Sequence, residues 1–451
     1  MILIFVYILC AVWYSLIEKM GKGLLAMEYS IQPAAFGAVA DGQTDCSEAF
    51  QRALDTLVSG GILYIPGGEY RLKKSIAVRH SHISIVGDGW RTHLVYDYVQ
   101  KEGDRAEQAS AFVFSEGIRD VTVRDIKLEY EGYFYPHFGE SYAGRINGLY
   151  FLQCFDVRIH HCDISGFNSS GIQVATGDEK KYAERFKVED CYLHHNRVAG
   201  VAYGYVDGIS ILNCDLEYQG SVLDGGTGYG CAGSSGEKPR HVQIKNNRAR
   251  FNYRKGIDLH ASIQAVIEGN ICVGNRLYGI YAEGPKTGDI LIRGNIVSGM
   301  KRKDVGLPLP YEWIEGISFG VWSEQCVEQE YFNYIISENE ITEFGLDRQH
   351  ARPIHCYSCF KKGSVQIKNN IIKCGRVDSV VQFAQPFYSG GQAISIDISG
   401  NQIFAERTEQ EIFVLAGFDT AALMNNRVRV EHSSADAAVS LPSGRGAAEV
   451  A

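Results

Sequence analysis

A short sequence pattern recurs along most of the 451-residue chain, at intervals of about 20 to 50 residues. Each copy reads Gly, aliphatic, any residue, apolar, any residue, and the clearest copies begin at Gly171, Gly200, Gly228, Gly256, Gly279 and Gly316. A second column precedes the next aliphatic run and holds Cys162, Cys191, Cys214, Asn247, Asn270, Asn295, Asn339, Asn370, Asn401 and Asn426. One such unit cannot bury its own apolar face, so the repeat indicates a solenoid.

The units are built from strands. Each holds two or three short stretches with period-2 alternation and no long helical pattern. We therefore expect an all-β chain in which a parallel β-helix spans residues 83–430. Forty-nine glycines suit a fold with a tight turn in every coil.

Residues 34–82 form a different module, which we expect to cap the solenoid. Asp45 is a candidate N-cap with Glu48 as its capping-box partner, and Gly60 follows as a stop signal. The apolar face of this helix holds Phe50, Ala53, Leu54, Leu57 and Val58. Solenoid ends need such covers, because an unpaired edge invites aggregation.

The two ends of the chain do not follow the repeat. Residues 1–33 open with an apolar run up to Ile17, which fits a signal peptide or short anchor, a packing segment, or a mis-assigned start ahead of Met27. Membrane association is not expected unless residues 1–17 are a real anchor. Residues 431–451 are small, polar and aperiodic, and we expect a flexible tail.

Charge and cysteine content narrow the range of partners. A formal charge of -9 disfavours nucleic acid, because no basic stripe is available to neutralise phosphates. Twelve cysteines form no Cys-x-x-Cys pair and no metal-ligand spacing, and stacked buried thiols explain them better than disulfides. Phosphate-loop and zinc motifs are also absent from the sequence, so neither cofactor nor metal is expected.

The repeat also sorts side chains by direction. Its second and fourth positions are apolar and must point into the bore, so the third and fifth face outward on one sheet and stack into ladders. The third-position ladder reads Tyr150, Gln173, Ala202, Gly230, Asp258, Tyr281, Ser318 and His355. The fifth-position ladder reads Leu152, Ala175, Gly204, Ala232, His260, Glu283, Gly320 and Tyr357.

Titratable residues gather where the Ala and Gly residues of these two ladders end. Asp258, His260, Tyr281 and Glu283 occupy two neighbouring coils, after coils of Ala and Gly that we expect to leave a shallow trough. The backbones of Asp258 and Glu283 should lie roughly 8 Å apart. That separation is compatible with both retaining and inverting glycosidase geometry. We take these four residues as the catalytic candidates.

Further residues are candidates for substrate binding. Arg254 and Lys255, in the turn before this strand, are placed to hold a carboxylate or sulfate, although a solvated turn explains them equally well. Aromatic rings stack well on sugar faces. The remaining binding candidates are Tyr205, Tyr229, Tyr253, Trp322 and His355.

The opening module carries a family resemblance. Phe36-Gly-Ala-Val-Ala-Asp-Gly-Gln-Thr-Asp45, the helix, and Gly61-Ile-Leu-Tyr-Ile-Pro66 resemble the start of the pectate-lyase-like β-helix superfamily. That group includes phage tailspike depolymerases, polygalacturonase-related hydrolases, polysaccharide lyases and mannuronan C5-epimerases. The resemblance implies a right-handed parallel β-helix with a polysaccharide partner, and it leaves the reaction open.

One strand resembles a catalytic strand of the epimerases. Their Gly-aromatic-Asp-Pro-His-Glu motif matches Gly256-Ile-Asp-Leu-His260, but Leu259 and Ala261 replace the Pro and the Glu. Only Asp258 and His260 therefore carry over, and Tyr281 or Tyr253 would take the proton-transfer role of the family's tyrosine. The polygalacturonase signatures Asn-Thr-Asp, Asp-Asp and Gly-His-Gly are absent from the sequence.

Three functions remain open at this point. The leading hypothesis is a glycoside hydrolase in which Asp258 and Glu283 divide the acid and base roles. The first alternative is a uronate lyase or C5-epimerase, and the second is a non-catalytic glycan-binding or structural spike. The tailspike resemblance implies an extracellular, cell-surface or virion-associated protein and allows a homotrimer.

Overall fold

The computed structural model describes residues 29–433 except 102, 133–144, 176–180, 221–226, 235–238, 261, 285–287, 300–312, 322–330, 347–349, 359–361, 385–392 and 416–420. Trp322 thus lies outside the described residues, as do residues 1–28 and 434–451.

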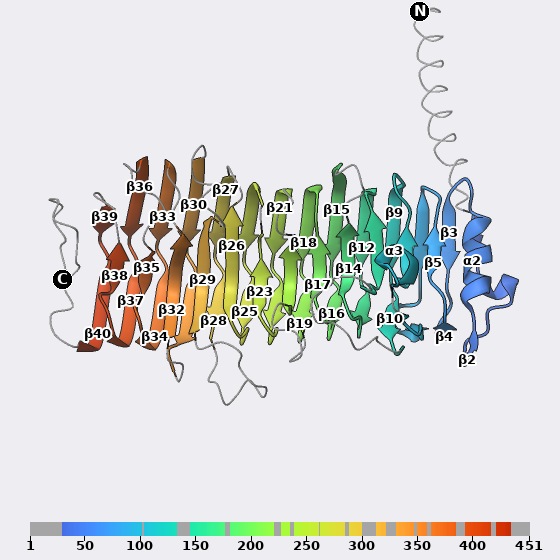
Figure 1. Ribbon diagram of the computed structural model, residues 1–451, viewed down its shortest axis with the longest axis horizontal. Coiled ribbons are helices and arrows are strands. Elements are labelled where there is room, and N and C mark those ends of the chain that lie inside the picture. The colour runs from blue at the N-terminus through green and yellow to red at the C-terminus, as the bar shows by residue number, and fades with distance from the viewer. Residues whose placement is uncertain are drawn as a thin grey trace, which may run out of the picture.

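Three long parallel sheets wind into one elongated solenoid (Figure 1). Sheets A and B have 14 strands each and sheet C has 12. In each sheet a strand pairs in parallel with its counterparts in the preceding and following coils, so each coil between the first and the last contributes one strand to every sheet. The predicted all-β parallel β-helix is confirmed.

The strands of sheet A are β1 (Ser30–Ile31), β3 (Gly61–Tyr64), β6 (Ile83–Val86), β9 (Arg119–Arg124), β12 (Phe155–His160), β15 (Ala183–Glu189), β18 (Val206–Leu212), β21 (Arg240–Lys245), β24 (Gln264–Glu268), β27 (Gly288–Arg293), β30 (Tyr331–Ser337), β33 (Lys362–Lys368), β36 (Ala393–Ser399) and β39 (Ala421–Met424). Those of sheet B are β2 (Asp41–Asp45), β4 (Gly68–Leu72), β7 (Thr92–Tyr96), β10 (Lys127–Tyr130), β13 (Asp163–Ser165), β16 (Tyr192–His194), β19 (Asp215–Glu217), β22 (Arg248–Arg250), β25 (Ile271–Val273), β28 (Ile296–Ser298), β31 (Glu340–Phe344), β34 (Ile371–Val377), β37 (Gln402–Thr408) and β40 (Arg427–Ser433).

The strands of sheet C are β5 (Ile76–Val78), β8 (Phe112–Phe114), β11 (Leu149–Leu152), β14 (Ser170–Ala175), β17 (Ala199–Tyr203), β20 (Tyr229–Gly233), β23 (Lys255–Asp258), β26 (Tyr278–Gly284), β29 (Trp313–Val321), β32 (His350–Ser358), β35 (Val381–Phe383) and β38 (Phe413–Leu415). The described helices are short: η1 (Pro33–Phe36), α2 (Ser47–Asp55), η2 (Gly89–Arg91) and α3 (Ala106–Ala109).

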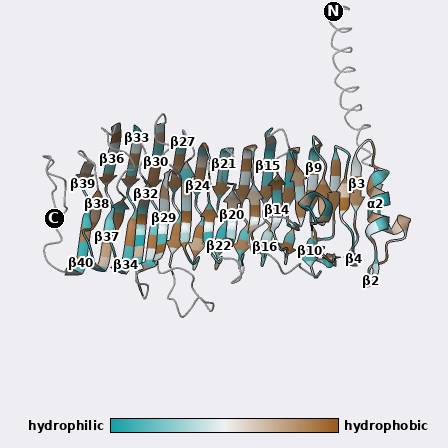
Figure 2. Cartoon of the chain, in the orientation of Figure 1, coloured by the Kyte–Doolittle hydropathy of each residue, from teal (hydrophilic) through white to brown (hydrophobic). Residues whose placement is uncertain are grey.

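The bore is a continuous apolar core. The second and fourth positions of the repeat point inward as expected, and Ile257, Leu259 and Ile280 are fully buried there. Figure 2 shows brown and blue-green residues alternating along the strands, which is the period-2 pattern that separates bore from surface. Each buried aliphatic side chain contributes about 1.5–3 kcal/mol, so the core stabilises every coil.

The Asn column is a hydrogen-bonded ladder inside one turn of each coil. The side-chain amide of Asn295 donates to Asn339 Oδ1 at 2.9 Å and to the Ile267 carbonyl of the preceding coil at 3.0 Å. The same pair of bonds repeats from Asn247 to Asn401, and Asn426 ends the column with the carbonyl bond alone. Cys162, Cys191 and Cys214 continue this column as buried thiols, and among the described cysteines none is paired in a disulfide.

The glycines of the repeat lie where neighbouring coils touch. A Cβ on Gly256 would lie 2.6 Å from the Gly279 carbonyl oxygen, and one on Gly279 would lie 2.9 Å from that of Gly316. One predicted register is wrong. Gly230 aligns with Gly256, and Ala232 pairs with Asp258, so this coil's unit begins at Gly230. Gly228 belongs to the preceding turn, with a φ of 102°.

Helix α2 covers the first coil, as Figure 1 shows at the blue end of the solenoid. Its Gln51 side chain accepts from the Ala77 N–H and donates to the Ala77 carbonyl, which satisfies the outer edge of sheet C at β5. The predicted capping box is wrong. Cys46 is the N-cap, Asp45 accepts from the Ser47 N–H, and Glu48 pairs with Lys74.

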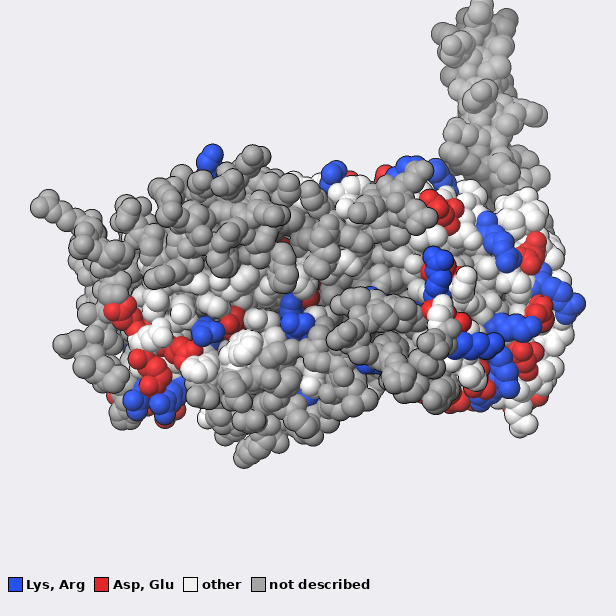
Figure 3. Space-filling view, viewed as in Figure 1, with Lys and Arg blue, Asp and Glu red and all other residues white. Residues whose placement is uncertain are grey.

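The helix is also shorter than the pattern predicts. It ends at Asp55, so Leu57 is buried from the following turn whereas Val58 is 66% exposed. On the face seen in Figure 3, Lys and Arg lie among Asp and Glu over the N-terminal coils. The N-terminal coils contain ion pairs such as Arg71–Asp97 and Lys74–Glu48. Within the described part of the chain, no helix has the length and apolar character needed to cross a membrane.

Candidate functional site

Two neighbouring strands of sheet C hold the predicted catalytic residues. Asp258 ends β23, and its register partner in the next coil is Tyr281 of β26. His260 follows β23 by two residues, and Glu283 follows Tyr281 by two. The outward direction of the third and fifth positions therefore brings all four side chains to one patch on the face of sheet C.

A continuous chain of contacts joins them. Asp258 Oδ2 lies 2.8 Å from His260 Nδ1, and His260 Nε2 lies 3.4 Å from Glu283 Oε2. The Tyr281 hydroxyl donates to Glu283 Oε2 at 3.3 Å. Both ring nitrogens of His260 therefore face a carboxylate oxygen, and the contact at Nδ1 is the shorter one. The imidazole thus stands between the two carboxylates.

Burial separates His260 from its neighbours. The side chains of Asp258 and Glu283 are 0% and 3% exposed, whereas that of His260 is 16% exposed. Burial alone would raise the pKa of Asp258, but His260 and Lys255 outweigh it and hold that pKa below its ordinary value. Burial raises the pKa of Glu283, so its proton is held more tightly. The group that solvent reaches is therefore the His260 imidazole. The two carboxyl groups beside it have pKa values that are shifted in opposite directions.

Lys255 is part of this network. It is the first residue of β23 and is buried, so it does not sit in a solvated turn. Its ammonium lies 3.1 Å from Asp258 Oδ2 and 3.5 Å from the centre of the Tyr281 ring. Burial, with Arg254 nearby, lowers the pKa of Lys255 to about 8, although Asp258 opposes the shift. The positive charge of Lys255 therefore stabilises the ionised form of Asp258.

Aromatic rings wall the network. Tyr281 stacks on Tyr357 of β32 with ring centres 5.3 Å apart, and Tyr278 lies 5.0 Å from Tyr281. Burial raises the pKa of Tyr281 well above its usual range, so the hydroxyl stays protonated. Tyr357 and Tyr278 were not predicted as site residues. The stack reaches across β29, where a register shift after Phe319 pairs Gly320 with Ser358 and leaves Tyr357 outside the expected alignment.

The other binding candidates divide between this cluster and other contacts. Tyr229 lies beside Lys255, with 5.5 Å from the ammonium to its ring, and its hydroxyl accepts from Arg254 at 2.9 Å. Tyr253 instead packs under Arg276, and Tyr205 packs its ring against Tyr182. His355 lies at the same ladder position as Asp258 but pairs with Glu315.

The expected shallow trough is wrong. Ala202 and Ala232, the small residues before Asp258, are buried together with Tyr229 in an apolar cluster outside the bore. Small side chains here let the Tyr229 ring pack close to the sheet, so they do not leave an open hollow.

The described residues contain no group of three or more His, Cys, Asp or Glu side chains arranged to hold a metal ion. Asp258 Oδ1 is buried and has no hydrogen-bond partner among these residues. Because Lys255 and His260 already surround this carboxylate, a metal ion would meet a positive charge there. The arrangement fits proton transfer by side chains.

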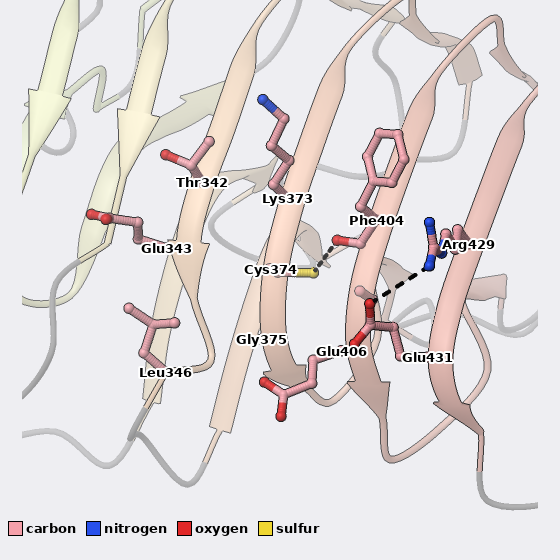
Figure 4. Close-up of a pocket in the computed structure, with 11 residues that line it drawn as sticks. Thr342, Glu343, Leu346, Lys373, Cys374, Gly375, Phe404, Glu406, Arg429 and Glu431 are labelled. Atoms are coloured by element: carbon pink, nitrogen blue, oxygen red, sulfur yellow. Dashed lines mark hydrogen bonds and ion pairs between the residues drawn. The ribbon is translucent and has the colours of Figure 1, made fainter.

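Two hollows lie on the other sheets. One of about 670 Å³ lies on sheet B near the C-terminal end and is lined by Lys373, Phe404 and Arg429 among others. In Figure 4, Arg429 turns toward Glu431 and Cys374 toward the Phe404 carbonyl. The other, of about 590 Å³, lies on sheet A between Gln243 and Gln366. Neither lining combines a buried carboxylate with an imidazole, so the cluster on sheet C is the candidate active site.

Two family models match the chain. The model described as right-handed β-helix region matches residues 147–323 and 230–428. The model described as rhamnogalacturonase A/epimerase, pectate lyase-like, matches residues 34–124, which contain the opening module.

Curated relatives are distant. The chain is 22% identical over 407 residues to the uncharacterized protein YclG of Bacillus subtilis, covering 83% of this chain and 62% of that protein. It is 29% identical over 136 residues to alginate lyase 7 of Azotobacter vinelandii, covering 26% of this chain and 16% of the lyase. The chain thus spans less than two thirds of the length of either relative.

Solved structures share the fold. The N-terminal fragment of gene product 12 of bacteriophage Phi29 has a TM-score of 0.59 at 17% identity, covering 93% of this chain and 74% of that one. The A-module of the mannuronan C-5 epimerase AlgE6 of Azotobacter vinelandii has a TM-score of 0.54 at 14% identity, covering 88% and 99%. At this identity the likeness concerns the fold alone.

Proposed function

The chain belongs to the right-handed β-helix family, and we propose that it is a polysaccharide-active enzyme that moves the C5 proton of a uronate residue through His260. One observation carries the proposal: the solvent-reaching member of the cluster is an imidazole, and both carboxylates lie behind it. A glycosidase would need its two carboxyl groups to flank the scissile bond.

Each residue has a defined part in this proposal. Asp258 accepts a hydrogen bond from the Nδ1–H group and orients the ring, which leaves Nε2 as the base that removes the C5 proton. Tyr281 is protonated and acts as the acid. Glu283, whose raised pKa favours the neutral acid, donates a hydrogen bond to the substrate carboxylate, and Arg254 and Lys255 contribute positive charge behind it.

Two outcomes follow from the same first step. In β-elimination the C5–H electrons form the C4–C5 double bond, the C4–O glycosidic bond breaks, and Tyr281 protonates the leaving oxygen. In epimerisation Tyr281 returns a proton to the opposite face of C5 and no bond of the chain breaks. Similarity to an alginate lyase over 136 residues supports uronate chemistry without choosing between these outcomes.

Glycoside hydrolysis is the second candidate. It is favoured by the opposite pKa shifts of Asp258 and Glu283, because such a split divides acid from base. A panel of alginate, polygalacturonate and neutral glycans separates the three readings. Unsaturated uronate absorbance indicates elimination, C5 deuterium uptake without cleavage indicates epimerisation, and reducing ends alone indicate hydrolysis. A panel with no signal at all would leave only a binding or structural role.

The setting of the protein is part of the proposal. We place it outside the cell or on a virion, which the resemblance to a phage protein supports. A homotrimer remains a proposed assembly state, and sedimentation equilibrium at several concentrations measures it directly.

A further inference from the structure

A second carboxylate, imidazole and cation meet on the same face of sheet C. Glu315 of β29 is buried, and its Oε1 lies 2.9 Å from His355 Nδ1 and 3.0 Å from the Arg352 guanidinium of β32. We call Arg352, Glu315 and His355 the second triad, and Lys255, Asp258 and His260 the first.

The two triads share one plan. In the first, Asp258 Oδ2 contacts His260 Nδ1 at 2.8 Å and the Lys255 ammonium at 3.1 Å. Each carboxylate is buried and has a second oxygen without a hydrogen-bond partner among the described residues. The sheet repeats only the position of the cation, since the Lys255 ladder leads to Arg352, whereas His355 occupies the ladder position of Asp258.

Two further residues, Asp378 and His350, extend the ion-pair network of the second triad. Arg352 also reaches Asp378 at 3.4 Å, and Asp378 in turn contacts His350 Nδ1 at 3.1 Å. His355 Nδ1 lies against Glu315 Oε1 without the geometry of a hydrogen bond, and this contact leaves Nε2 as the nitrogen for a ligand. The Arg352 and His355 side chains are 25% and 11% exposed, whereas Glu315 and Asp378 lie beneath them.

The charges define what such a site accepts. Arg352 already contacts Glu315 and Asp378, so its charge is balanced within the site, and a hydroxyl group gains more from this site than the carboxylate of a sugar does. Hydroxyl groups, which donate to Nε2 and accept from the guanidinium, fit both neighbours. Sugars present hydroxyl groups along their length.

We propose that the second triad is a glycan-contacting site that binds the hydroxyl groups of a sugar on the same chain whose reacting residue lies at His260. This rests on the proposed function. Asp258 and His355 are three coils apart in one ladder, about 14 Å, so only an oligosaccharide reaches both triads.

Oligosaccharides of two lengths test this. Trisaccharides and hexasaccharides of mannuronate, guluronate and galacturonate are titrated calorimetrically and assayed with wild type, His355→Ala and the control His241→Ala. His241 forms a comparable ion pair with Asp207 on sheet A, away from both triads. We expect His355→Ala to raise the Kd and KM for hexasaccharides about tenfold with kcat unchanged, and to leave trisaccharide turnover as in wild type.

Other results have clear meanings. Equal losses for both lengths, or none for either, would overturn the second site and leave a purely structural ion-pair network. A length-dependent loss of binding without any turnover would sink the proposed reaction while keeping the site. A chain that binds none of the oligosaccharides would overturn both. If the alanine variant does not fold, His355→Gln, which keeps a donor toward Glu315, takes its place.

Discussion

His260 depends on two carboxylic acids that solvent scarcely reaches. Asp258 Oδ2 lies 2.8 Å from its Nδ1, and Glu283 Oε2 lies 3.4 Å from its Nε2. Their pKa values move in opposite directions because Asp258 has two cationic or donor neighbours whereas Glu283 is governed by burial. The two acids therefore have different expected responses to isosteric amides.

Asp258→Asn should abolish most activity, whereas Glu283→Gln should be mild. An Asn at position 258 can present its amide donor to Nδ1, which favours the imidazole tautomer with the proton on Nε2. The expected loss of kcat is about 10³-fold or more. A Gln at 283 imitates a neutral acid and should cost less than about tenfold. Initial rates on the best uronate polymer measure both, and comparable large losses in the two variants would favour the hydrolase reading.

Lys255 gives stability a dependence on pH. Its folded pKa, about 8, lies below the ordinary 10.5, so between these values the unfolded chain binds more protons. The unfolding free energy should therefore rise with pH across this window, by on the order of 3 kcal/mol, and carry the full penalty below pH 8. Urea unfolding of wild type and Lys255→Met at several pH values checks this. An identical pH dependence in both would remove Lys255 as its source.

At the residue scale, the sequence predicted the direction in which side chains point better than the residues that they contact. Period-2 alternation placed Asp258, His260, Tyr281 and Glu283 on one face, because a strand allows only two directions. It missed Lys255 as a buried ion-pair partner, since the same ladder position holds Tyr278 and Glu315 in the next two coils and so shows no recurring charge. Glu315 and Tyr357 were missed because their partners come from neighbouring coils whose spacing varies.

At the scale of the element, the Asn ladder joins coil to coil. Asn295 donates to Ile267 O and Asn339 Oδ1 and accepts from the Asn270 backbone and amide. These groups are buried, so a missing partner leaves several polar atoms without hydrogen bonds. The sequence predicted this column from its spacing alone, because each Asn occupies the same place before an aliphatic run.

Asn295→Ala should lower the unfolding free energy by about 3 kcal/mol. Asn333→Ala is the matched control, because its amide bonds Asp289 on the outer face of sheet A, and about 0.5 kcal/mol is expected there. Chemical unfolding followed by circular dichroism measures both. Equal midpoints for the two variants would mean that the ladder does not carry the coil junctions.

Two element-level predictions failed for local reasons. Gly228 and Gly230 both fit the repeat, and only the close approach to the next coil identifies Gly230 as the column member. The capping box failed because Asp45 bonds Ser47 and Glu48 is drawn to Lys74 of the next coil. Tertiary contacts decided both cases, and no local pattern records them.

At the scale of the whole molecule, helix α2 covers the N-terminal end of the solenoid. Helix α2 buries Phe50, which packs its ring edge against Tyr70 with centres 5.6 Å apart. Gln51 of the same helix satisfies the edge strand of sheet C. The helix therefore closes the bore and blunts an edge that would otherwise pair with another chain.

Phe50→Ala should cost about 4 kcal/mol and promote aggregation through the opened end. Val58→Ala serves as the control, because Val58 lies outside the helix and is exposed. Thermal unfolding and light scattering measure the two effects. If Phe50→Ala matched the control in both, the helix would not be acting as a cap.

The proton NMR spectrum of uronate polymers incubated in D₂O with wild type and His260→Ala tests the central claim most directly. We predict that wild type produces unsaturated uronate ends or places deuterium at C5, and that His260→Ala loses this signal by about 10³-fold. New reducing ends with neither unsaturation nor deuterium, or an unimpaired His260→Ala variant, would contradict proton transfer at His260.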